Sequence, residues 1–176
     1  MGIASLFKQT ASKFPDKVAI EFEAQRVTFR EIDLQGNRVA NAFQSMGIVK
    51  GDRVAQYLPN CLELVYSLIG NFKNGSIVVP MNASFKEQEI LHILSDSGSK
   101  AIVTDLNHLN IIKNIENKIP NLKFIILVDG NDNGTLNFNE LAKNAPDNDP
   151  NIKIADNDYS IIFYTSGTTG KPKELR

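Results

Sequence analysis

Hydrophobic residues from residue 51 onward form short apolar runs that alternate with longer segments of helical periodicity. The apolar runs predict strands at residues 53–57, 76–79, 101–104, 124–128 and 160–164. Between the first four runs, apolar residues recur at steps of three and four and predict helices at residues 61–73, 86–95 and 106–118. Such alternation is typical of βαβ units. We therefore predict an α/β fold in which a parallel sheet is flanked by helices on both faces.

The first fifty residues predict two helices and a small N-terminal hairpin. Residues 1–14 have an amphipathic pattern that Pro15 ends. Residues 18–22 and 26–29 predict two short strands with a tight connection, which place a hairpin beside the sheet. A further helix is predicted over residues 30–46, and Gly47 can end it in the left-handed cap conformation.

Two polar stretches interrupt this pattern. Residues 129–135 are rich in Asn, Asp and Gly and predict a turn, while residues 144–151 hold two prolines among acids and amides and predict a linker. We accordingly divide the chain into an α/β subdomain (1–143), a linker (144–151) and a strand plus loop (152–176). Because few residues follow the last predicted strand, we expect the fold to be cut off there.

Charge and composition narrow the class of protein. The 176 residues include 19 Lys and Arg against 20 Asp and Glu, a net charge of −1, and the basic residues are scattered, so we expect no nucleic-acid partner. The longest apolar run, residues 124–128, is far shorter than the roughly 20 residues of a membrane span, and no hydrophobic leader is recognised after Met1. The single cysteine, Cys61, excludes an intrachain disulfide. We expect a cytoplasmic protein without a membrane span.

The sequence YTSGTTGKPK at residues 164–173 is the strongest candidate for chemistry. Its glycines allow backbone N–H groups to approach an anion, its hydroxyls can donate hydrogen bonds, and its lysines offset negative charge, as phosphates require. It is not a Walker A loop, because Thr165 and Pro172 stand where that motif has glycine and Ser or Thr. The alternative is a solvated surface turn, the usual role of such a composition.

The order of residues in this loop resembles the signature loop of the adenylate-forming superfamily, which includes acyl-CoA synthetases, luciferases and the adenylation domains of peptide synthetases. Other segments are similar to that family in the same order, namely residues 27–32, 51–55, 58–60, 72–82 and 96–100. Asn74 and Ser76 replace alanines that are usual in the family, and Asp158 stands where the family has an acid ahead of the loop. The resemblance spans nearly the whole chain.

The resemblance implies a partial N-terminal domain of the adenylate-forming fold. Family members activate a carboxylate at the α-phosphorus of ATP with Mg²⁺ bound, release pyrophosphate and usually pass the acyl group to a thiol, most often that of coenzyme A. The residues that would bind the phosphates by this resemblance are Thr165, Ser166, Gly167, Thr168, Thr169, Gly170 and Lys171, with Lys173 as a further contact.

The same resemblance implies that the nucleoside and acyl pockets and the catalytic C-terminal domain come after the loop and are absent here, so that no catalytic residue is assigned. Glu174 stands where the family usually has glycine, and its carboxylate would oppose anion binding. Two hypotheses follow. The chain is either the N-terminal fragment of a carboxylate-activating ligase, inactive alone and prone to self-association, or a non-catalytic α/β binding or assembly module.

Structural roles are expected for the remaining unusual residues. Gly51, Pro80 and Gly98 are predicted to set turns, and Asp52 to form local hydrogen bonds. His92 and His108 are predicted to be solvated, since no second imidazole lies at ligand spacing. Cys61 is predicted to be a small core residue.

Overall fold

A five-stranded sheet forms the centre of the computed structural model, which describes residues 2–166 and 172–175, with side chains up to Thr165. The sheet contains β3 (Arg53–Tyr57), β4 (Ile77–Met81), β5 (Ala101–Thr104), β6 (Phe124–Leu127) and β7 (Leu136–Asn137). All its pairings are parallel and the strand order is β4-β3-β5-β6-β7. The predicted α/β class with a parallel sheet is confirmed.

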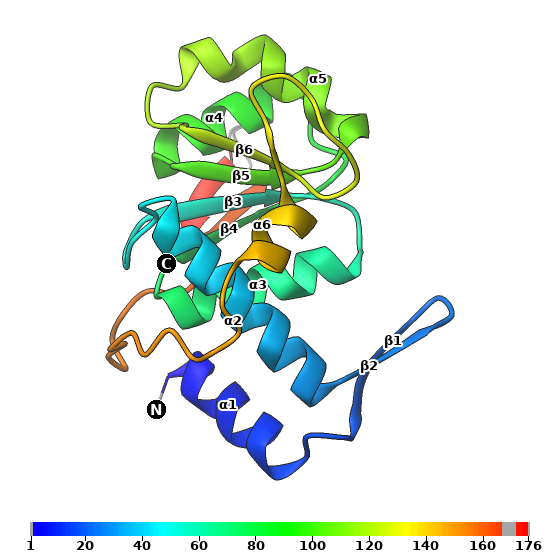
Figure 1. Ribbon diagram of the computed structural model, residues 1–176. Coiled ribbons are helices and arrows are strands. Elements are labelled where there is room, and N and C mark those ends of the chain that lie inside the picture. The colour runs from blue at the N-terminus through cyan, green and yellow to red at the C-terminus, as the bar shows by residue number, and fades with distance from the viewer. Residues whose placement is uncertain (1, 167–171, 176) are drawn as a thin grey trace.

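Helices cover both faces of this sheet (Figure 1). One face packs on α4 (Glu87–Ser97) and α5 (Leu106–Ile115), the second of which continues into a short 3₁₀ turn, Glu116–Lys118. The other face packs on α2 (Phe29–Ser45), α3 (Leu62–Asn74) and α6 (Phe138–Asn144). Neighbouring strand residues alternate between the two cores: Val54 faces α2 and Ala55 faces α4 and α5. This alternation explains why the strands are apolar throughout.

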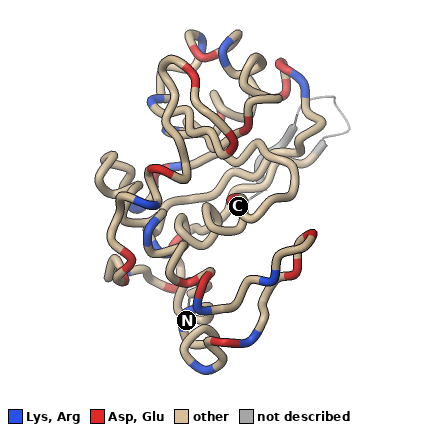
Figure 2. Tube along the Cα trace, turned by 45° about the vertical axis from the view of Figure 1, so that its right-hand side comes forward, with Lys and Arg blue, Asp and Glu red and all other residues tan. Residues whose placement is uncertain are grey.

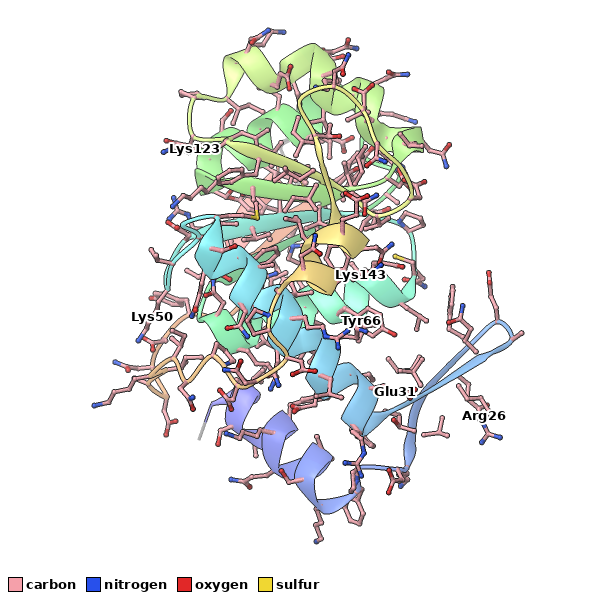
Figure 3. The ribbon with its side chains drawn as sticks, in the orientation of Figure 1. Arg26, Glu31, Lys50, Tyr66, Lys123 and Lys143 are labelled. Atoms are coloured by element: carbon pink, nitrogen blue, oxygen red, sulfur yellow. The ribbon has the colours of Figure 1, made fainter. Side chains whose placement is uncertain are left out.

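The predicted N-terminal helix and hairpin are both present, and they pack on α2 and α3. Helix α1 (Ile3–Lys13) precedes a hairpin of β1 (Val18–Phe22) and β2 (Gln25–Thr28), which projects from the body of the molecule (Figure 1). Figure 3 shows Arg26 directed outward from this hairpin, where it pairs with Glu21 at 3.0 Å. Both side chains are well exposed, so this pair adds little stability.

Two sequence predictions need correction. Pro80 lies within β4 rather than in a turn, which is possible because β4 is an edge strand. Residues 160–164 do not form a further strand of the parallel sheet: Ile161 makes one isolated bridge to Val78, and the chain continues as β8 (Phe163–Ser166) in a separate hairpin. The sequence analysis also missed β7 and α6.

The segment predicted as a linker is attached to α2 along its length. Asn41 donates to the carbonyl oxygens of Pro146 and Asn148, each at 2.9 Å. Asn37 donates to the carbonyl oxygen of Asp147 at 2.8 Å, and Lys8 on α1 pairs with Asp149 at 2.5 Å. The domain division at residues 144–151 remains a prediction, and these contacts show that the segment packs on the α/β unit.

The amino ends of the strands are held by charged side chains. Asp52 accepts hydrogen bonds from the Val49 N–H at 2.9 Å and from the Lys100 ammonium at 2.6 Å, which confirms its predicted local role. Gly51 and Gly98 have φ angles of 85° and 60°, as their predicted turns require.

No helix within residues 2–166 or 172–175 combines the length and apolarity that crossing a membrane requires.

Candidate functional site

The motif predicted to bind phosphates begins where the chain leaves the open edge of β4. The Val78 N–H donates to the Ser160 carbonyl, and the Ile162 N–H donates to the Val78 carbonyl, each at 2.9 Å. Two residues further along β4, Pro80 has no N–H with which to extend this ladder. The chain therefore turns away after Ile162, whose side chain is buried against the α4 and α5 core.

Beyond this point the chain forms an antiparallel hairpin of β8 and β9 (Pro172–Leu175). Their register pairs Thr165 with Lys173 and Ser166 with Pro172. The backbone thus brings together three of the predicted phosphate-binding residues, Thr165, Ser166 and Lys173. The other five, Gly167, Thr168, Thr169, Gly170 and Lys171, lie outside the described residues.

Two residues of α4 contact β8, and sequence reasoning missed both. The Tyr164 hydroxyl donates to the Asp96 carboxylate at 2.7 Å. The Tyr164 ring also meets the His92 ring edge to face, with 6.4 Å between ring centroids. His92 is half-buried, so the prediction of a solvated imidazole is wrong. The separation of 68 residues between Asp96 and Tyr164 left no local signal in the sequence.

A second polar cluster lies at the carboxyl ends of β3 and β5. The Asp105 carboxylate accepts a hydrogen bond from the backbone N–H of His108 at 2.9 Å, and it lies 2.5 Å from Nδ1 of the His108 imidazole. Nε2 of the same ring lies 3.0 Å from the carbonyl oxygen of Ala83. The ring packs against Tyr57, whose hydroxyl donates to the Phe85 carbonyl at 2.6 Å, and burial raises the pKa of Tyr57.

This cluster contains the residue types of a catalytic Asp and His pair, but the hydrogen bonds of its imidazole are all made within the protein. Both ring nitrogens of His108 face acceptor oxygens, so neither is directed toward a substrate. His108 is only 18% exposed, and the prediction that it is solvated is therefore also wrong. The cluster ties α5 and the loop after β4 to the sheet.

Charged residues of both signs alternate along the described chain. Figure 2 shows Lys and Arg interspersed with Asp and Glu along the described trace. Asp158, the acid ahead of the loop, pairs with Lys50 at 2.5 Å and accepts a hydrogen bond from the Ala155 N–H, and these contacts lower its pKa. Among the residues that the structure describes, no group of three His, Cys, Asp or Glu side chains is placed to hold a metal ion.

Comparison with known protein families decides the classification. A model described as "AMP-binding enzyme" matches residues 7–174, nearly the whole chain. The chain belongs to this family. Both the described fold and the motif at residues 164–173 agree with the resemblance inferred from the sequence.

Relatives that match the chain include proteins named as ligases and as synthase subunits. The chain is 30% identical to a medium/long-chain-fatty-acid–CoA/3-oxocholest-4-en-26-oate–CoA ligase of Mycobacterium marinum, over 98% of this chain and 33% of that protein. It is 33% identical to Surfactin synthase subunit 3 of Bacillus subtilis, over 95% of this chain and 12% of that protein. The chain thus spans about a third of the ligase's length.

Solved structures of AMP-binding enzymes share the fold of this chain. An anthranilate CoA ligase, AuaEII, in complex with anthranoyl-AMP superposes with a TM-score of 0.92 at 27% identity, covering 99% of this chain and 34% of that one. A fatty acyl CoA synthetase of Mycobacterium tuberculosis superposes with a TM-score of 0.86, also at 27% identity, covering the same two shares. These likenesses place the described α/β unit in the N-terminal region of adenylate-forming enzymes.

Proposed function

We propose that this chain is the N-terminal part of an ATP-dependent carboxylate-activating ligase that forms an acyl adenylate and then a thioester, with coenzyme A as the acceptor. The observation that carries this proposal is the motif YTSGTTGKPK at residues 164–173 in a chain that matches the AMP-binding family over residues 7–174. The names of the ligases among its relatives support the thioester step.

Phosphate binding is the role that we assign to the motif. Thr165, Ser166, Thr168 and Thr169 would supply hydroxyl donors, Gly167 and Gly170 would allow close approach of backbone N–H groups, and Lys171 and Lys173 would supply positive charge. When a substrate carboxylate attacks the α-phosphorus, pyrophosphate leaves, and donors on the β- and γ-phosphates stabilise the charge on that leaving group. Magnesium would arrive on the phosphates as part of the MgATP substrate.

We further propose that the 176-residue chain alone does not form acyl adenylates. The assigned residues contact only the phosphates, and positioning a carboxylate against the α-phosphorus needs groups that orient both reactants. The chain spans about a third of the ligases that it matches, so the other reacting groups would belong to further parts of such an enzyme.

Binding of MgATP and of pyrophosphate by the purified chain, measured by calorimetry, tests this function. We expect Lys171→Ala and Lys173→Ala each to weaken binding by about tenfold, the effect of one lost charge-assisted hydrogen bond. The control is Lys123→Ala, because Lys123 lies at the amino end of β6, a different region of the sheet (Figure 3).

Two outcomes would contradict the proposal. Wild-type protein that binds neither ligand would favour the non-catalytic binding or assembly module. Carboxylate-dependent pyrophosphate release by the chain alone would show that the expected inactivity is wrong.

A further inference from the structure

The strand that leads into the phosphate-binding motif is only briefly attached to the sheet. The backbone of β4 holds the chain at Ser160 and Ile162 through Val78, and Pro80 then ends the ladder. Any precise placement of Thr165 and the residues after it therefore depends on side chains that fix β8 after Ile162.

Side-chain burial along this segment alternates as in a strand with one covered face. Ile162 is buried and Tyr164 is half-buried against the α4 and α5 core, whereas Phe163 and Thr165 are exposed. Tyr164, the first residue of the motif, is thus the last described side chain that faces the body of the protein. Its hydroxyl reaches Asp96 at 2.7 Å, and its ring lies against His92.

Asp96 occupies a position that does not favour its charge. It lies in the last turn of α4, which ends at Ser97, and a carboxylate there opposes the negative end of the helix dipole. Helix α4 itself is firmly held, because Ile90, Ile93 and Leu94 are fully buried against the sheet. The acid therefore gives no stability to its own helix, but it presents a hydrogen-bond acceptor from a rigid support.

From these contacts we propose that Tyr164 is a positioning residue for the phosphate-binding motif, acting through its hydrogen bond to Asp96 on α4. This inference rests on the proposed function. Tyr164 sets the direction of β8 and, through the β8–β9 register, the placement of Thr165 opposite Lys173. Loss of the hydroxyl would leave the hairpin folded but poorly oriented, which weakens phosphate binding without unfolding the domain.

Amide hydrogen exchange of the 176-residue chain, without any ligand, tests the anchor directly. In Tyr164→Phe and Asp96→Ala we expect amides of residues 163–166 and 173–175 to exchange about five to ten times faster, the effect of one ordinary hydrogen bond, because the bond to Asp96 is exposed to solvent. Amides of Val54 and Val103 should be unchanged. Combining the two substitutions should add nothing, because both remove the same bond.

Two further variants separate positioning from a general structural effect. Asp96→Asn keeps an acceptor oxygen and should restore most of the protection that Asp96→Ala loses. Tyr66→Phe removes a tyrosine hydroxyl from α3, on the other face of the sheet, and should leave the β8–β9 amides unchanged (Figure 3). Unaltered exchange in Tyr164→Phe, or equal effects of Tyr66→Phe, would overturn the proposal.

Binding of MgATP distinguishes this inference from the proposed function. If the wild-type chain binds, Tyr164→Phe should weaken binding by about the factor seen in exchange, at unchanged urea midpoint. Faster exchange of the β8–β9 amides in Tyr164→Phe, together with an unchanged affinity for MgATP, would overturn the positioning role. If the wild-type chain does not bind, the proposed function fails, and the exchange comparison alone decides whether Tyr164 anchors β8.

Discussion

Buried polar side chains at the end of α3 form a connected set at the residue scale. Ser76 donates to the Asn71 side-chain oxygen at 2.7 Å, and the Asn71 amide donates to the Ser67 carbonyl at 2.8 Å. Asn74 donates to the Ile48 carbonyl at 3.1 Å. By the resemblance inferred from the sequence, alanines were expected at positions 74 and 76, and the side chains of Asn74 and Ser76 form hydrogen bonds that alanine side chains could not.

We expect Ser76→Ala to lower the free energy of unfolding by about 1–3 kcal/mol, because it leaves the buried Asn71 oxygen without its donor. Adding Asn71→Leu should recover part of this loss, since replacing both partners by apolar groups removes the unpaired atom. Urea unfolding measures each variant, with Ser12→Ala on exposed α1 surface as the control. A Ser76→Ala variant as stable as the control would contradict this reading.

The start of α2 carries a capping box that couples stability to pH. Glu31 accepts hydrogen bonds from the Thr28 N–H and hydroxyl, each at 2.7 Å, and the backbone bond, followed by the hydroxyl bond, lowers the pKa of Glu31 (Figure 3). Because the folded pKa lies below the ordinary value of 4.5, this contribution is present above pH 4.5 and is lost as pH falls through the folded pKa.

Thr28→Ala should therefore cost about 1 kcal/mol of unfolding free energy at pH 7, the usual effect of losing an N-cap. Glu31→Gln should flatten the decline in stability below pH 4.5 without abolishing it. Chemical denaturation across pH 3–7 gives both values, and Thr10→Ala within α1 is the control, since alanine is well suited to a helix interior. An identical acid decline in Glu31→Gln would show that the capping carboxylate is not responsible.

At the scale of elements, α2 and α3 approach closely because each contributes a glycine to the crossing. A methyl group at Gly36 would overlap the Ile69 side chain, and one at Gly70 would lie 2.6 Å from Cβ of Val39. Both neighbours are β-branched and stiff at χ1, so neither can move aside cheaply. The two glycines set the distance between these helices.

Gly70→Ala should destabilise the protein by about 1–3 kcal/mol, although alanine is the better helix former. In a Val39→Ala background the same substitution should cost less but still destabilise the protein, because the clashing Cγ1 of Val39 is removed while its Cβ at 2.6 Å remains. Thermal and urea unfolding provide the comparison, and Gly2→Ala is the control because nothing lies within 4 Å of an added methyl there. Equal costs in both backgrounds would exclude a clash with Val39.

Elements with continuous apolar patterns were predictable from the sequence, and those set by missing hydrogen bonds were not. The predicted strands 53–57 and 101–104 agree with β3 and β5 at both ends, because apolar runs covered on two faces have sharp limits. Residues 160–164 have the same pattern, yet Pro80 on the neighbouring strand cannot donate the third ladder bond that would follow those at Ser160 and Ile162. Helix α6, at Phe138–Asn144, is too short to show a clear period.

At the scale of the whole molecule, the sequence predicted the motif of the candidate site but not the side chains that contact it. The order of residues in the motif at 164–173 indicated phosphate chemistry and the family. Tyr164, His92 and Asp96 meet only because β8 crosses α4 in three dimensions, so no local pattern could reveal their contact. Tertiary topology supplies the support, while local composition supplies the ligand-binding groups.

Self-association of the chain remains a prediction, and the structure sharpens where it would occur. In the segment that leads into β8, Ile162 is buried and Ile161 half-buried, while Phe163 is 52% exposed and close in sequence to Tyr159, which is 56% exposed. Pro80 on the edge strand β4 disfavours pairing of sheet edges between copies. Association would therefore bury aromatic side chains rather than extend the sheet.

We expect light scattering at micromolar concentrations to detect dimers or larger species, and Phe163→Ser to shift the protein toward monomer. Val49→Ser is the matched control, because Val49 is equally exposed but lies before β3, at the amino end of the sheet. We expect association because covering the exposed Phe163 side chain with a second copy lowers the free energy by roughly 25 cal/mol per Å² of apolar surface buried. A wild-type chain that is monomeric at every concentration would mean that Phe163 and its neighbours do not drive self-association. Equal shifts in both variants would mean that the contact between copies lies elsewhere.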